Sequence, residues 1–149
     1  MKINAIYLFS QNQYDLDLTH FIANQLETPV RSPSLETSFS KDEDFLGALW
    51  FIDANSTNFL KFFLNSVEKL KIGKGSIYFF ADRKKSLRQI QEIKNKVHYG
   101  NVIFRSSDPI EKSAKKVFAL SCFPENRPHF LFPENGRNSL QKKWSVKNF

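Results

Sequence analysis

The residue best placed for chemistry is Asp53, which directly follows the apolar run of residues 48–52. Such a run is typical of a strand covered on both faces, and a carboxylate at its end is partly desolvated. A carboxylate in that position can serve as a nucleophile or as a metal ligand. Asp53 can instead cap the turn formed by residues 53–56, because Asp side chains bond to nearby backbone amides. The residues alone leave both interpretations open.

Polar side chains also follow the other apolar runs of strand length. Parallel strands present their carboxyl ends at one edge of a sheet, and open α/β sheets bind their ligands there. We therefore predict a binding site at that edge, in which an arginine can contact an anion through two N–H groups. The predicted site residues are Ser10, Asp53, Asp82, Arg105 and Ser106.

These side chains must be positioned by strands that alternate with helices. The apolar runs of strand length are residues 3–9, 48–52, 76–80 and 101–104. Apolar residues at helical spacing predict helices over residues 15–27 and 57–71, and a capping pattern predicts another helix that begins near Ser86. Asp108-Pro109-Ile110-Glu111 is a strong start signal for a last helix. Residues 28–40 read as a short edge strand or a loop, and residues 40–47 as a short helix.

This alternation predicts an α/β fold, a three-layer sandwich with a doubly wound sheet of about five parallel strands. We assign this domain to residues 1–122. Residues 123–149 differ in composition, being rich in basic and aromatic side chains, and we expect them to form an irregular tail.

The net charge of +7 is unevenly distributed along the chain. Residues 1–60 carry a net charge of −5, so the remainder carries +12. This asymmetry suggests a charged protein partner or a second copy of the chain, and a basic face also suits nucleic-acid phosphates. Solvated helix faces would explain it equally well. The candidate interface residues are Arg83, Lys84, Lys85, Arg88, Lys112, Lys115 and Lys116.

Composition excludes several classes of function. One cysteine and three scattered histidines favour neither a disulfide framework nor a metal site, so we predict no metal. The five glycines form no phosphate-binding loop, and we predict no cofactor and no enzymatic activity. No apolar run has the length of a membrane span and the first residues do not resemble a signal peptide, so we expect a cytoplasmic protein that does not bind membranes.

In element order and spacing, residues 3 to about 122 resemble the receiver domain of response regulators, with a CheY-like fold. The order and spacing of the last strand and helix are similar to those in receivers of LuxR-type regulators. The resemblance places the phosphoacceptor of that family at Asp53. The family's acidic pair, which holds Mg²⁺, is missing near Phe9, Ser10 and Gln11, and its hydroxyl residue is replaced at Ala81-Asp82. Its Lys-Pro pair is replaced by Arg105-Ser106.

These departures imply a degenerate receiver in which Asp53 is a vestigial phosphoacceptor. Phosphorylation of an aspartate relies on a metal ion to stabilise charge, and one isolated carboxylate binds Mg²⁺ poorly. We therefore expect a signalling module that acts without phosphorylation, through self-association or through binding a regulator of transcription. The alternative is a nucleic-acid-binding accessory domain that uses the basic face of residues 83–116 and the tail.

Overall fold

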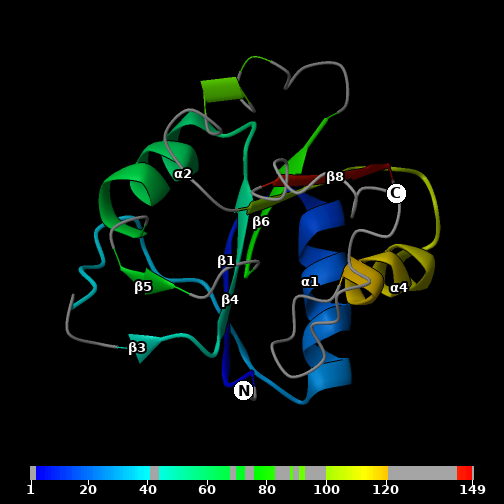
Figure 1. The fold of residues 1–149 in the computed structure, drawn as a ribbon, viewed down its shortest axis with the longest axis horizontal. Helices are drawn as coiled ribbons and strands as arrows, with labels where there is room; N and C mark the ends of the chain where they lie inside the picture. The colour runs from blue at the N-terminus through cyan, green and yellow to red at the C-terminus, as the bar shows by residue number, and fades with distance from the viewer. Residues whose placement is uncertain are drawn as a thin grey trace.

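The computed structural model describes residues 3–40, 44–67, 70–72, 76–82, 88, 91–92, 100–120 and 144–148. Its centre is a parallel sheet whose strands lie in the order β2-β1-β4-β6-β7-β8 (Figure 1). In that order the strands are Val30–Arg31, Ala5–Phe9, Ala48–Asp53, Ile77–Ala81, Gly100–Phe104 and Trp144–Asn148.

Helices cover both faces of this sheet, which gives the three layers expected from the sequence. Helices α1 (Gln13–Leu26) and α4 (Ile110–Leu120) pack on one face, and α2 (Thr57–Phe62) lies on the other (Figure 1). Every residue of β1, β6 and β7 is buried, because each strand has packing partners above and below. The doubly wound α/β architecture with its parallel sheet is therefore confirmed.

Alternate residues of the central strands feed two separate cores. Toward α2 the core is rich in aromatic rings, with Tyr7 stacked on Trp50 at 4.3 Å between ring centroids. Toward α1 and α4 the core is mainly aliphatic, and Leu18 and Ile22 of α1 are fully buried in it. This second core fixes α1 and α4 over the strands whose ends carry the predicted site.

The predicted short helix over residues 40–47 is wrong in the part that the structure describes. Asp44–Phe45 forms strand β3, which pairs in parallel with β5 (Lys71–Ile72) in a separate two-stranded sheet. Phe45 is buried and packs edge-on against Trp50, with centroids 5.5 Å apart. Burial of this ring outweighs the local helix signal of the preceding acidic residues.

The predicted helix over residues 57–71 is shorter than expected. The α-helical part ends at Phe62 and continues as a π-helical turn, η1 (Phe63–Val67), before the chain enters β5. Phe63 and Val67 are fully buried, so the wider turn still places apolar side chains in the core.

Two other expectations lie partly outside the described residues. Of the helix predicted to begin near Ser86, the structure describes Arg88, Gln91 and Glu92, and these are helical. Of residues 123–149, it describes β8, which adds a strand beside β7 where an irregular tail was expected. Across the described ranges, no helix has the length and apolar character needed to cross a membrane.

Candidate strand-end site

Arg105 follows β7 directly and directs its guanidinium over the carboxyl ends of the neighbouring strands. Its Nε donates to Asp15 Oδ1 at 2.9 Å, and its Nη2 donates to Asp15 Oδ2 at 2.6 Å and to Asp53 Oδ1 at 2.7 Å. Its Nη1 donates to Asn55 Oδ1 at 2.8 Å and to Asp82 Oδ1 at 3.2 Å. A guanidinium has five N–H donors, so these contacts use them all.

Asp15 is the innermost acceptor of this network. It lies in the first turn of α1 and is fully buried, with 0% of its side chain exposed. Besides the two contacts from Arg105, its Oδ2 accepts a hydrogen bond from the Ser10 hydroxyl at 2.7 Å. A buried carboxylate is tolerated only when it is paired and hydrogen-bonded, and Asp15 meets both conditions.

The first turn of α1 is held in place by its own capping contacts. Asn12 is the N-cap residue, and its Oδ1 accepts from the amides of Tyr14 at 2.9 Å and Asp15 at 3.4 Å. The Asn12 amide in turn donates to Ser10 Oγ at 3.1 Å. These bonds satisfy helix-terminal donors and aim Asp15 at the strand ends.

Asp53 takes the turn-closing role that the sequence allowed for it, and it also pairs with Arg105. Its Oδ1 accepts from the Asn55 amide at 2.9 Å, which closes the turn after β4, and the same oxygen accepts from Arg105. Asn55 Oδ1 also accepts from the Asp82 amide at 3.0 Å, which links the ends of β4 and β6. Ser56 then caps α2, since its hydroxyl accepts from the Phe59 amide at 3.3 Å.

The network is acidic and graded in exposure, with three carboxylates around one guanidinium. The exposed side-chain fractions are 0% for Asp15, 15% for Asp53 and 43% for Asp82. Burial raises the pKa of Asp15 by more than the hydrogen bonds and charge of Arg105 and the bond from Ser10 lower it. Burial alone would lower the pKa of Arg105, but Asp15 and Asp53 outweigh it and raise that pKa, so the guanidinium stays charged.

Four of the five predicted site residues meet in this network: Ser10, Asp53, Asp82 and Arg105. Ser106 does not belong to it among the described contacts, because its hydroxyl accepts from the Asp108 amide at 3.2 Å at the approach to α4. Asp15 and Asn55 were missed. Asp15 had a detectable signal, because it lies three residues before Leu18 and seven before Ile22, on the face of α1 that is buried.

The predicted basic face is only partly described. Lys112 and Lys115 are exposed on α4, and Arg88 is exposed as well. The Asp108 carboxylate lies 4.0 Å from Lys112 Nζ and 3.8 Å from Lys116 Nζ. Arg83, Lys84 and Lys85 lie outside the described residues.

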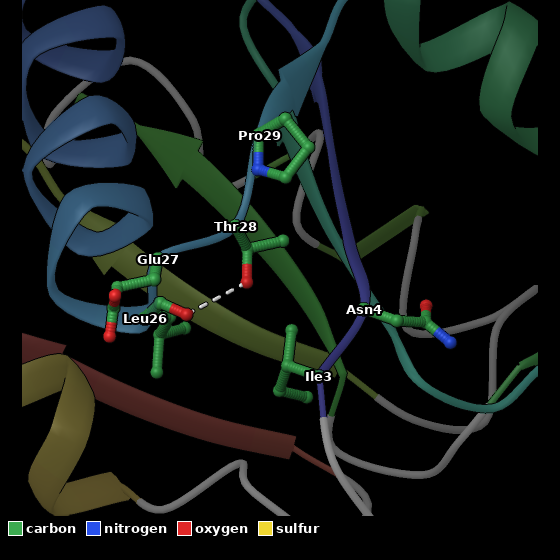
Figure 2. Close-up of a pocket in the computed structure, with 6 residues that line it drawn as sticks. All are labelled: Ile3, Asn4, Leu26, Glu27, Thr28 and Pro29. Carbon is green, nitrogen blue, oxygen red and sulfur yellow. Dashed lines mark hydrogen bonds between the residues drawn. The ribbon is translucent and has the colours of Figure 1, made fainter.

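A pocket of about 590 Å³ lies at the opposite edge of the sheet, where β1 begins and α1 ends (Figure 2). The Thr28 hydroxyl beside it donates to the Leu26 carbonyl at 3.0 Å. The lining residues are Ile3, Asn4, Leu26, Glu27, Thr28 and Pro29. None of them belongs to the Arg105 network, so the pocket and the strand-end site are separate.

The strand-end site holds its own cation, the Arg105 guanidinium. Within the described ranges, no group of three or more His, Cys, Asp or Glu side chains could hold a metal ion. In comparisons with known proteins, the chain matches no protein-family model, no curated protein and no solved structure.

Proposed function

We propose that the chain is a receiver-like signalling module that works without phosphorylation, in the cytoplasm, by binding protein. The observation that carries the proposal is the saturation of Arg105 by the chain's own acceptors. In the proposed likeness to receivers, this arginine replaces the lysine of the family's Lys-Pro pair. With every N–H donor engaged, it has none to offer an incoming anion without breaking one of these contacts.

The position of Asp53 supports the same proposal. A phosphoryl group on Asp53 would have to displace Arg105 from Oδ1 or approach a carboxylate flanked by Asp15 and Asp82. Like charges this close oppose the addition of a further anion, and the guanidinium occupies the space between the carboxylates. The network thus favours one fixed state of the strand ends over a state that switches on phosphorylation.

Binding to protein is supported by the charge distribution. Residues 1–60 are net acidic and the rest of the chain is net basic, so two copies can meet through opposite charges. Lys112 and Lys115 on α4 are exposed, although Lys112 also lies near the Asp108 carboxylate. The interaction we propose is self-association, binding of a regulator protein, or both.

Incubation with acetyl phosphate and Mg²⁺, followed by intact-mass spectrometry, tests the absence of phosphorylation. We expect no phosphoryl adduct on the native chain or on the Asp53→Asn control. Stoichiometric modification of the native chain that Asp53→Asn abolishes would overturn this part of the proposal.

Sedimentation velocity over a range of protein and salt concentrations tests the binding of protein. We expect reversible self-association that weakens as salt rises and that acetyl phosphate does not alter. A chain that stays monomeric throughout, and that retains no protein from an extract of its own cells, would contradict this part.

The alternative function, binding of nucleic acid, rests on the same exposed lysines. Against it, the charges of Lys112 and Lys116 lie near the Asp108 carboxylate, which reduces the positive potential of α4. A mobility-shift titration across salt concentrations distinguishes the two functions, because phosphate contacts give a steep salt dependence. Strong binding at low salt that Lys112→Ala and Lys115→Ala weaken would favour the alternative.

A further inference from the structure

A series of hydrogen bonds, joined through the residues Asn12 and Tyr14 themselves, connects the strand-end network to α4. Arg105 binds Asp15, and Asp15 accepts from the Ser10 hydroxyl. Ser10 accepts from the amide of Asn12, whose side chain caps the amide of Tyr14. The series then reaches α4 through the Tyr14 hydroxyl, which donates to Ser113 Oγ at 3.0 Å.

The same two regions are also joined through the backbone, which closes a ring. Arg105 directly follows β7, and only residues 106–109 separate it from the first residue of α4. Ser113 is fully buried in α4, and Ala114 beside it packs in the core shared with α1. The Tyr14 ring lies edge-on to Phe80 of β6, with centroids 6.3 Å apart. The first turn of α1 is therefore bonded to Arg105 through Asp15 and to α4 through Tyr14.

We infer that Arg105 and α4 are energetically coupled through the first turn of α1, so that the strand-end network sets how α4 packs against α1. Asp15 and Tyr14 are adjacent in that turn, and both depend on the same N-cap. If the Arg105–Asp15 ion pair breaks, the first turn of α1 is no longer bonded to the strand ends. The Tyr14–Ser113 hydrogen bond then loses its fixed geometry. Arg105 and Ser113 are positioning residues in this device, and the coupling holds whether or not the chain is a signalling module.

The coupling has a consequence for the exposed face of α4. Lys112 and Lys115 lie on the same helix as Ser113, so the placement of these charges follows the placement of α4. A partner that binds this face in one arrangement of α4 would stabilise the Arg105–Asp15 pair by the same amount as the pair favours binding.

A double-mutant cycle between Arg105→Gln and Ser113→Ala tests the coupling by urea unfolding. Among the described contacts, none joins the two side chains directly, and independent sites at a distance have additive effects. Ser113→Ala should raise the unfolding equilibrium constant in both backgrounds. We expect the factor of increase in the Arg105→Gln background to be smaller than the factor in the native chain by about threefold or more. Thr28→Ala provides the matched control, because Thr28 bonds to Leu26 at the other end of α1. Its effect should be the same in both backgrounds.

Two outcomes would overturn the inference. One is an effect of Ser113→Ala that Arg105→Gln leaves unchanged, which would make the two sites independent. The other is an equal loss of effect for Ser113→Ala and Thr28→Ala, which would indicate general loosening. If Arg105→Gln does not fold, Arg105→Lys takes its place in the cycle. Amide exchange at Tyr14 and Asp15 should then be faster than in the native chain, and unchanged exchange would contradict the coupling.

Discussion

The guanidinium of Arg105 and the carboxylate of Asp15 form a two-point ion pair, with Nε–Oδ1 at 2.9 Å and Nη2–Oδ2 at 2.6 Å. The pair joins the end of β7 to the first turn of α1, two segments separated by 90 residues of sequence. Parallel forks of this kind are among the stronger charge-assisted hydrogen bonds in proteins. In this chain the pair organises the whole strand-end site.

Asp15→Ala should destabilise the fold strongly. The substitution leaves the Arg105 charge buried without its main partner, and such losses cost about 3–5 kcal/mol in free energy of unfolding. Asp17→Ala is the control, because Asp17 is exposed on the same helix and should change stability by less than about 0.5 kcal/mol. Urea unfolding of both variants measures the difference, and similar small losses for the two would show that Asp15 does not anchor Arg105.

The stability difference between the native chain and Asp15→Asn should depend on pH. Because burial raises the pKa of Asp15 above its ordinary value of 3.8, the folded state binds the proton more tightly than the unfolded state. Asp15 therefore contributes stability fully below that ordinary pKa, and the contribution is lost as the pH rises through the raised pKa.

We accordingly expect the native chain to gain stability relative to Asp15→Asn as the pH falls from about 7 to about 4. Urea unfolding at several pH values measures this difference. A relative loss of native stability over the same interval would mean that the attraction of Arg105 outweighs burial at Asp15.

Arg105→Lys should be less stable than the native chain but more stable than Arg105→Gln. Lysine keeps the positive charge, yet its ammonium is a compact group with three donors and cannot reproduce the planar fork. Glutamine removes the charge and leaves the buried Asp15 without a cation, at a cost of about 3–5 kcal/mol. Thermal or urea unfolding ranks the three proteins, and equal stability of the two variants would show that the charge itself contributes nothing.

Substitution of the more buried carboxylate should lower the free energy of unfolding by more than substitution of the more exposed one. Asp82→Asn should change stability by less than about 1 kcal/mol, because Asp82 is 43% exposed and its contact with Arg105 is 3.2 Å long. Asp53→Asn should cost more, since Asp53 is 15% exposed and its oxygen both closes the turn and accepts from Arg105. A larger loss for Asp82→Asn than for Asp53→Asn would contradict the graded network.

The sequence was informative about the sheet because its strands are continuous apolar runs with polar residues at their ends. The positions of Ser10, Asp53, Asp82 and Arg105 at one edge follow from that pattern and from parallel topology alone. The residues that Arg105 contacts do not follow from this pattern. Asp15 comes from a helix, and its role depends on how α1 rotates over the sheet, which is set by the burial of Leu18 and Ile22.

The local helix signals were informative only where tertiary packing agreed with them. The start of α4 near residue 110 was predicted because proline and acidic residues mark a helix start. Asp108 itself contacts Lys112 and Lys116. Around residue 45 the acidic residues predicted a helix, but Phe45 is drawn into the aromatic core beside Trp50 and the chain becomes a strand. Such long-range contacts are invisible to a pattern confined to neighbouring residues.

Side-chain NMR of Arg105 tests the central claim most directly. With the guanidinium signals assigned by comparison with Arg105→Lys, we expect separate Nη1 and Nη2 resonances, because five hydrogen bonds prevent rotation of the group. We also expect slow hydrogen exchange, and no change in these signals when Mg²⁺ and beryllofluoride are added. A freely rotating guanidinium with averaged, fast-exchanging signals, or one that shifts on adding beryllofluoride, would contradict a site filled by its own arginine.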